Sequence, residues 1–310
     1  MNIDNPLGNA FEYGRLELPS EYSDVNGDRR LHVVGMTGID HDDRDELYVV
    51  NARPSVDIIT GDFLDQATKG GNSTIEQLSI DANGDVHLIK TWVHPQIATP
   101  NRVAPLVDGS FYFTNDHGPH RAGLRHQLSD LLDSGDVSFC HHDGECKLVS
   151  SGHHFPNGLA LGNDGLLYVP SAALGGIQVY RPAPDGSITK VEDIKIPMPL
   201  DNISPDMDGD LYIAGIPKAF EMMAGFDDPL NTKPPATAWK VHKKDDGSYE
   251  FGKALEDRNA EALPGATSVV HDARTGRLFI SGVYSPFVTV CEKTAADGVA
   301  SEQHTVKIEL

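Results

Sequence analysis

The sequence lacks three features: a set of paired cysteines, a long hydrophobic run and an excess of positive charge. Its 310 residues include three cysteines, Cys140, Cys146 and Cys291, which do not make a disulfide framework. No stretch of about 18 apolar residues is present, so no membrane-spanning helix is expected. The first residues carry neither the basic nor the apolar part of a secretory signal. These absences together favour a reduced, cytoplasmic protein.

Basic residues are also scarce, with 25 Lys and Arg against 46 Asp and Glu and a formal net charge of −21. Such a charge argues against nucleic acid and anionic membranes as partners, because both would repel the chain. Acidic clusters such as Asp206, Asp208 and Asp210 are better explained by solvated turns than by calcium binding. We therefore expect a small-molecule partner, and the sequence leaves the oligomeric state open.

What the sequence does contain is a repeated pattern. Each copy is an apolar strand, a turn rich in Asp, Asn and Gly, and a second strand with an aromatic residue near its start. Four copies begin at Asn101, Asn157, Asn202 and Thr267, and a looser fifth begins at Thr37. Strand-only repeats of roughly 45 to 65 residues are typical of a β-propeller.

The turns support the same architecture. Dipeptides such as Asp108-Gly109 and Asp208-Gly209 lie between short β-rich runs and predict hairpins. We predict a single all-β domain over residues 1–310, a propeller of four-stranded blades. Five blades are expected, and they cover 31–92, 99–150, 153–196, 199–255 and 262–293. The last run supplies three strands, so the N-terminal FEYGRLELP would close the ring and remove both sheet edges. A ring of six blades is the alternative.

Two insertions interrupt the repeats and contain apolar residues at helical spacing. They are 117–136, with RHQLSDLLD, and 216–235, with IPKAFEMMAGF. Both follow a second strand and are expected over the face that carries the Asn residues. They would act either as lids over a pocket or as simple covers of the blade tops. Phe220, Met222, Met223 and Phe226 suit an adaptable apolar pocket.

Strand geometry predicts two sets of side chains on the top face. Residues that begin inner strands are Thr37, Asn101, Asn157, Asp201, Asn202 and Thr267; those that end second strands are Asn51, Arg53, Asn115, Asp116, His117, Ser171, Lys218 and Tyr284. The expected substrate contacts are Thr37, Asn51, Arg53, Asn101, Asn157, Ser171, Phe220, Met223 and Tyr284. The expected metal ligands are Asn101, Asn157, Asp201 and Asn202, because amide and carboxylate oxygens suit calcium. With one certain carboxylate, such a site would bind a divalent ion weakly.

Several stretches of the chain resemble the paraoxonase/arylesterase family of calcium-dependent propeller lactonases, and more distantly the gluconolactonase group. They are FYFTNDH (111–117), SGHHFPNGLAL (151–161), IQVYRP (177–182), LDNISPDMDGDLYIA (200–214) and LPGATSVV (263–270). The resemblance implies a catalytic calcium held by one Glu, three Asn and one Asp. Four of these positions match Asn101, Asn157, Asn202 and Asp201.

The departures from the family pattern bear on the same site. The resemblance places the family's Glu in a first blade that this chain does not contain. The Asp that serves the family's structural calcium matches Arg102, the two His of the proposed catalytic dyad match Thr37 and Ala52, and the half-cystine partner of Cys291 is absent. The resemblance therefore implies that the family's proton-transfer groups are missing, one calcium is lost and the other is weakened.

Other polar residues offer chemistry of their own. His117 follows Asp116 and is expected at the pocket rim, as a general base or a hydrogen-bond donor to a substrate carbonyl. A rim histidine bonded to Asp116 is the simpler interpretation. Arg102 and Lys218 would polarise a carbonyl. A soft metal site is a further hypothesis for Cys140, His141, His142 and Cys146, on an outer hairpin.

Three functions fit these residues. We rank first a repurposed enzyme of natural-product biosynthesis that cyclises an apolar substrate, for example by hetero-Diels–Alder cycloaddition. His117, Asp116, Arg102 and Lys218 would be its catalytic residues, and substrate orientation would supply much of the rate. A calcium-dependent lactonase or arylesterase ranks second, and a non-catalytic binding propeller third. The expected cofactor is accordingly none, or a weakly held calcium ion.

Overall fold

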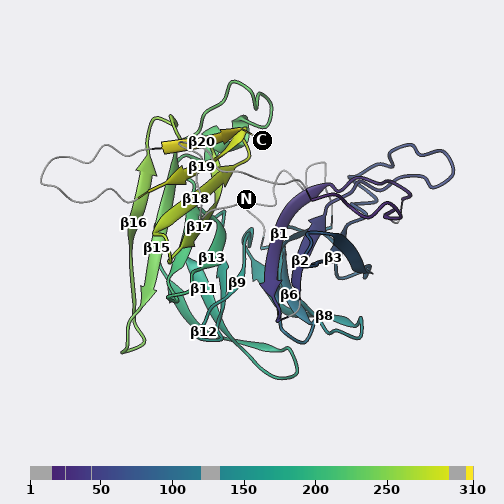
Figure 1. Cartoon of the computed structure of the whole chain (residues 1–310), viewed down its shortest axis with the longest axis horizontal. Helices are drawn as coiled ribbons and strands as arrows, with labels where there is room; N and C mark the ends of the chain where they lie inside the picture. Colours follow the sequence, from purple (N-terminus) through teal and green to yellow (C-terminus); the bar gives the residue numbers. More distant parts are fainter. Residues whose placement is uncertain (1–15, 25, 43, 120–132, 293–304, 310) are drawn as a thin grey trace, which may run out of the picture. The chain divides into compact units, whose positions relative to one another are not determined.

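The chain folds as a five-blade β-propeller that is almost entirely β. The computed structural model describes residues 16–24, 26–42, 44–119, 133–292 and 305–309. Twenty strands form five antiparallel sheets of four, and the strands of each sheet are consecutive in the chain (Figure 1). The predicted count of five blades is therefore confirmed.

The first two sheets lie in the N-terminal half of the chain. The first comprises β1 (Val33–Asp40), β2 (Asp45–Asn51), β3 (Thr74–Ile80) and β4 (Val86–Trp92). The second comprises β5 (Pro100–Pro105), β6 (Phe111–Asn115), β7 (Gly135–Cys140) and β8 (Cys146–His153).

The other three sheets follow in order. The third comprises β9 (Ala160–Leu161), β10 (Leu167–Pro170), β11 (Ile177–Pro182) and β12 (Ile188–Ile194). The fourth comprises β13 (Leu200–Pro205), β14 (Leu211–Gly215), β15 (Ala236–Lys243) and β16 (Tyr249–Asp257). The fifth comprises β17 (Ala266–Asp272), β18 (Arg277–Gly282), β19 (Phe287–Cys291) and β20 (Thr305–Glu309).

The chain forms two compact units, which are considered separately below. Of the described residues, the N-terminal unit contains those within 16–161 and 180–191, and the C-terminal unit contains those within 162–179 and 192–309. A core in the N-terminal unit gathers aromatic side chains of the first and second sheets. There the Trp92 and Phe111 rings meet edge to face, with centroids 4.8 Å apart.

The predicted hairpins form because one turn geometry recurs between strands. In the turn after β3, the Asp81 carboxylate accepts the backbone N–H groups of Asn83 (2.8 Å) and Asp85 (3.0 Å). Gly84 then takes a φ of 86°, which glycine adopts at little cost. The turn after β13 is built in the same way on Asp206. These local contacts explain why the Asp, Asn and Gly pattern marks the blades so clearly.

The predicted closure of the last blade is wrong. The fourth strand of the fifth sheet is β20, which pairs with β19 over Thr305–Glu309. The expected N-terminal strand FEYGRLELP lies largely outside the described residues, and its described part, residues 16–19, is not a strand.

The two expected insertions have different outcomes. Helix α2 (Ala219–Ala224) confirms the helix predicted within 216–235. The helix predicted from RHQLSDLLD falls on residues 120–132, outside the described part of the chain.

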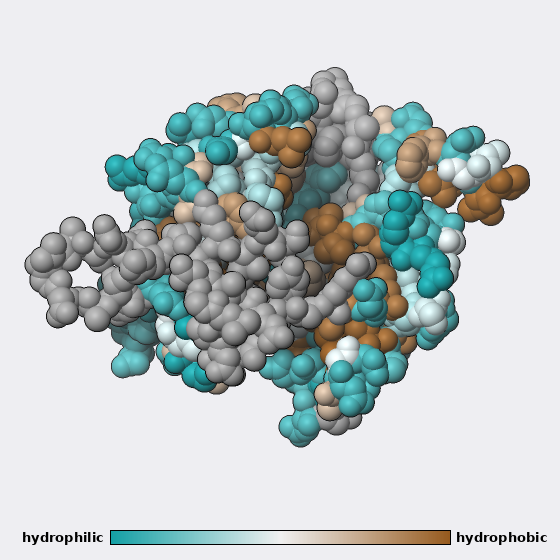
Figure 2. All heavy atoms as spheres, turned by 45° about the horizontal axis from the view of Figure 1, so that its top comes forward, coloured by the Kyte–Doolittle hydropathy of each residue, from teal (hydrophilic) through white to brown (hydrophobic). Residues whose placement is uncertain are grey.

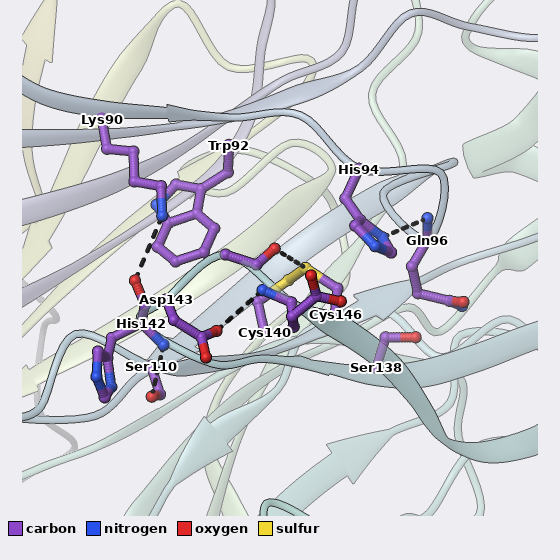
Figure 3. Close-up of a disulfide and its surroundings, with 12 residues drawn as sticks. Lys90, Trp92, His94, Gln96, Ser110, Ser138, Cys140, His142, Asp143 and Cys146 are labelled. Atoms are coloured by element: carbon purple, nitrogen blue, oxygen red, sulfur yellow. Dashed lines mark hydrogen bonds between the residues drawn. A yellow bond between two sulfur atoms is a disulfide. The ribbon is translucent and has the colours of Figure 1, made fainter.

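Reduced cysteines were expected, and this is wrong for two of the three. Cys140 and Cys146 face each other across β7 and β8 and form a disulfide (Figure 3). Because both sulfur atoms are bonded to each other, the soft metal site predicted here is also wrong. A cytoplasmic location thereby loses one of its supports, since disulfides are more typical of oxidising compartments.

A thiol titration tests this assignment. We expect one reactive thiol per chain in denaturant without reductant, and three after reduction. In the native protein that thiol, Cys291, should react slowly near neutral pH, because burial, with Asp257 nearby, raises its pKa to about 11. The variant Cys291→Ser should show none without reductant, and three thiols in unreduced wild type would contradict the disulfide.

On the face drawn in Figure 2, the described residues show polar side chains over much of the surface and hydrophobic side chains in a few places. The most exposed apolar side chains include Ile58 (88%) and Ile59 (90%), in the long connection between β2 and β3, and Phe220 (93%) on α2. No helix in the described ranges is long and apolar enough to cross a membrane.

Candidate functional site

A β-bulge near the start of the first strand positions the predicted site residues. In β5 the register shifts between Pro100 and Val103, and in β13 it shifts between Leu200 and Ile203. Bulges re-aim side chains and occur often beside active sites. The two bulges contain Asn101 with Arg102, and Asp201 with Asn202.

The register corrects how the repeats align. Pro100 pairs with Asn115 as Leu200 pairs with Gly215, so Asn101 corresponds to Asp201 and Arg102 to Asn202. The sequence comparison, which matched Asn101 with Asn202, was therefore displaced by one residue.

Thr37 also lies elsewhere than predicted. It does not begin a strand but pairs with Tyr48 in the middle of β1, and the bulge of that strand lies before Met36. Its counterpart in β5 is Ala104, which pairs with Tyr112. Because side chains alternate along a strand, Thr37 does not share the placement of Asn101.

In the N-terminal unit three predicted residues meet in one polar cluster, joined by a hydrogen bond and a short ion-pair contact. The Asn101 side-chain amide donates to Asp116 Oδ2 at 3.1 Å, and Asp116 Oδ1 lies 2.5 Å from His117 Nδ1. The imidazole is 9% exposed. The Thr99 hydroxyl donates to the His117 carbonyl at 2.5 Å and fixes the backbone beneath it. An amide, a carboxylate and an imidazole are thus held in a nearly buried row.

The segment before Asn157 completes this cluster. Phe155 has a φ of 46°, a left-handed conformation that costs an L-residue about 1–2 kcal/mol. Its ring lies nearly parallel to the His117 imidazole, with centroids 6.2 Å apart and an interplanar angle of 13°. The next residues are anchored, because Thr114 Oγ1 donates to the Asn157 carbonyl at 2.6 Å.

Two asparagine oxygens have the character of cation ligands. Asn157 Oδ1 in the N-terminal unit and Asn202 Oδ1 in the C-terminal unit are buried and accept no hydrogen bond from the described residues. The Asn202 amide nitrogen donates to Asp201 Oδ1 (2.9 Å) and the Thr267 carbonyl (2.8 Å), which fixes which atom is the oxygen. A buried acceptor without a donor is costly, and an oxygen-seeking ion such as calcium would satisfy it.

A metal that prefers histidine or cysteine ligands has less support from the described residues than calcium has. Among the residues that the structure describes, no three His, Cys, Asp or Glu side chains gather as a metal site. Taken separately, Asn157 in the N-terminal unit and Asn202 with Asp201 in the C-terminal unit offer amide and carboxylate oxygens, which are donors that calcium accepts.

Asn51 and Asn115 hold the fold rather than a substrate. Each side-chain oxygen accepts a backbone N–H from the segment that precedes the first strand of its own sheet. His32 N–H donates to Asn51 Oδ1 at 2.8 Å, and Thr99 N–H donates to Asn115 Oδ1 at 2.9 Å. Each amide nitrogen reaches a carboxylate on the third strand, Glu76 (3.4 Å) or Asp136 (2.9 Å). Burial raises the pKa of Asp136. We therefore no longer propose Asn51 as a substrate contact.

Arg53 is also engaged internally. Its guanidinium is 1% exposed, pairs with Asp24 at 2.7 Å and donates to the Asn72 carbonyl at 3.1 Å. Breaking a buried pair of this kind leaves an uncompensated charge. We therefore assign Arg53 to the fold and not to substrate binding.

The predicted residues of the C-terminal unit surround α2 and the end of β10. Lys218 pairs with Glu221 at 2.8 Å, and both side chains are more than half exposed. Tyr284 is buried and donates to the Met222 carbonyl, whereas Phe220 and Met223 are exposed. Ser171 Oγ accepts from the Leu174 N–H at 3.0 Å and shapes the turn after β10.

Arg102 is half-buried in the β5 bulge beside Gly35 of β1. Sequence reasoning missed three features of the N-terminal unit: the buried carboxylate Glu76, the half-buried carboxylate Asp136 and the left-handed Phe155. An acidic residue in the interior of a predicted strand, as in TIEQLSI, is a signal for Glu76. No sequence signal marks Phe155.

Comparisons with known proteins identify a family match and two curated relatives. A family model described as Arylesterase matches residues 68–285. Serum paraoxonase/arylesterase 2 of Gallus gallus is 28% identical over 205 residues, 65% of this chain and 52% of the relative. Serum paraoxonase/arylesterase 1 of Mus musculus is 27% identical over 136 residues, 43% of this chain and 38% of the relative. The chain thus spans about half the length, or less, of these curated relatives.

Solved structures resemble the chain more weakly. Virginiamycin B lyase from Staphylococcus aureus has a TM-score of 0.46 at 12% identity, and the match covers 90% of this chain and 84% of that one. A likeness at this level carries no functional comparison.

Proposed function

Because the chain belongs to the arylesterase family, we propose that it is a hydrolase that cleaves esters or lactones of apolar small molecules. The observation that carries the proposal is the nearly buried row of Asn101, Asp116 and His117. It supplies a proton-transfer group, although the residues that match the family's dyad are Thr37 and Ala52.

The Asp116–His117 pair performs the proton transfers in this proposal. Asp116 Oδ1 lies 2.5 Å from Nδ1 of the imidazole and pairs with that nitrogen in this proposal. The other nitrogen, Nε2, then takes a proton from water as the water oxygen attacks the carbonyl carbon. The C–O bond to the leaving group then breaks, and His117 returns the proton to the departing oxygen. The Asn101 amide, bonded to Asp116 Oδ2, keeps that carboxylate in place.

Calcium fits the oxygen atoms that this site offers. When bound, it supplies electrostatic stabilisation of the oxygen that becomes negative during hydrolysis. In the N-terminal unit the candidate ligands are Asn101 and Asn157, the latter with its buried, unsatisfied Oδ1. Asp201 and Asn202 of the C-terminal unit stay proposed ligands on the same chemical grounds.

Cyclisation of a natural product, ranked first from the sequence alone, now ranks second. The family supports hydrolysis, and the retained Asp116–His117 pair gives the water a base that a cycloaddition does not need. Lys218, proposed to polarise a carbonyl, is more than half exposed and pairs with Glu221. Arg102, half-buried in the β5 bulge, is the residue that a cyclase would still use.

Metal removal tests this proposal. We expect the protein to hydrolyse phenyl acetate and an aliphatic lactone, and to lose about 100-fold or more of that activity with a calcium-specific chelator. Added calcium should restore it. Asn157→Ala and Asn202→Ala should each lower the bound calcium measured by elemental analysis, whereas Asn163→Ala, whose amide donates to the Asp206 and Met207 carbonyls, should not.

The opposite outcomes are equally clear. Hydrolysis that survives the chelator unchanged would remove calcium from the proposal. A purified protein that hydrolyses neither substrate, but cyclises an apolar polyene, would reverse the ranking.

A further inference from the structure

We propose that Phe155 is a positioning residue for His117. Its ring, placed nearly parallel to the imidazole by a strained backbone, keeps His117 in the orientation in which Nδ1 faces Asp116. This inference deepens the proposed function, on which its kinetic readout rests, but its structural readout is independent of it.

The first observation is the backbone of Phe155. Its φ of 46° lies in a region that L-residues rarely adopt, and Ala260 is the other non-glycine residue with positive φ in the described ranges. A bulky aromatic residue is a true outlier there. Pro156 follows directly and restricts the preceding residue further. Such conformations persist only where the surrounding structure enforces them, and they cluster at functional sites.

The second observation is how the surroundings enforce this conformation. A Cβ atom on Gly135 would overlap the Pro156 ring, so Pro156 is packed directly on the β7 backbone. The Asn157 carbonyl is bonded to Thr114 of β6 at 2.6 Å. On the other side, His153 Nε2 is bonded to Ser150 Oγ at 2.8 Å. Phe155 is therefore fixed from both directions along the chain.

The third observation is what the strained residue achieves. The Phe155 ring lies nearly parallel to the His117 imidazole, at 13° and 6.2 Å between centroids. Asp116 Oδ1 lies 2.5 Å from Nδ1 at the edge of the imidazole, and the Thr99 hydroxyl donates to the His117 carbonyl. The ring adds a restraint on one face, which opposes rotation of the imidazole about its Cβ–Cγ bond.

That orientation matters because the two imidazole nitrogens have different roles. The hydrogen bond made by one nitrogen decides which tautomer is present and so which nitrogen is the base. If the ring turned over about the Cβ–Cγ bond, Cδ2 would face Asp116 and Cε1 would take the place of Nε2, so the carboxylate would lose its nitrogen partner and the water would lose its base. Loss of orientation of this kind costs rate more than affinity.

The test compares Phe155→Ala with Phe155→Tyr. We expect Phe155→Ala to lower kcat about tenfold or more while KM changes less than about threefold, and Phe155→Tyr, which keeps the planar ring, to retain at least half of kcat. Nitrogen NMR of the His117 imidazole should show one dominant tautomer, with Nδ1 protonated, in wild type and Phe155→Tyr. Phe155→Ala should show a mixture.

Ala260→Gly is the matched control, because it relieves positive φ at a residue of the C-terminal unit that the proposed mechanism does not use. It should leave kcat and the His117 signals unchanged. If Phe155→Ala does not fold, Phe155→Gly, which suits the positive φ, replaces it.

An unchanged tautomer in the ring-deleted variant would overturn the proposal, and so would a rise in KM alone, which would make Phe155 a substrate contact. If wild type hydrolyses nothing, the proposed function fails, and the NMR comparison still decides the role of Phe155.

Discussion

Replacing His117 with alanine should lower ester hydrolysis by about 10²- to 10⁴-fold, the usual contribution of a positioned general base. The imidazole is nearly buried and lies 2.5 Å from the Asp116 carboxylate, so no solvent group replaces it easily. Asp116→Asn should also reduce kcat strongly, since an amide at that position no longer favours the Nδ1-protonated tautomer. Initial rates at saturating substrate, with circular dichroism to verify folding, measure both effects.

His242 offers a matched control for His117. Its Nδ1 lies 2.6 Å from Asp210 Oδ1, a pair of the same chemistry, but it stands on β15 of the C-terminal unit with a side chain 56% exposed. His242→Ala should therefore keep wild-type activity. If His117→Ala folds and keeps more than half of the activity, the Asp116–His117 pair is a structural contact and the proposed mechanism is wrong.

Replacing Gly135 with alanine should be strongly destabilising and should also impair activity. A Cβ at this position would stand 2.2 Å from Pro156 Cδ and 3.1 Å from the Asn115 carbonyl oxygen, well inside contact distance. Overpacking of this kind lowers the free energy of unfolding by about 1–3 kcal/mol. The displaced Pro156 would move Phe155 and Asn157 with it. Thermal unfolding and the rate of ester hydrolysis together measure the two consequences.

Gly252 on β16 is the control for this substitution. No atom lies within 4 Å of a Cβ built there and its φ is not positive, so Gly252→Ala should change stability by less than about 1 kcal/mol. If Gly135→Ala unfolds at the wild-type temperature, Pro156 is free to move, and the packing that enforces the Phe155 conformation is weaker than inferred.

Much of the fold followed from the sequence because its signals are local. An Asp side chain that bonds N–H groups two and four residues ahead, followed by a left-handed glycine, makes a turn without help from distant residues. The same holds for helix α2 within the second insertion. The strand that completes the last blade was missed because either end of the chain is able to pair with an open edge.

The site was predicted less completely, since its key features depend on contacts between segments far apart in the chain. Asn101, Asp116 and His117 were identified by residue type, and the structure brings them together. Asn51 and Arg53 had the same polar character. The structure bonds Asn51 to Glu76 on β3 and pairs Arg53 with Asp24, and no local sequence pattern indicates either partner.

By itself, then, the sequence determined the number of blades, their turns and the residue types available for chemistry, all of which depend on neighbours a few positions apart. The tertiary structure alone decided the register of the β5 bulge, the pairing of Cys140 with Cys146 and the left-handed backbone of Phe155. The physical reason is that a strand shifts its register, and a residue keeps a strained conformation, only when packing from distant segments outweighs the local cost.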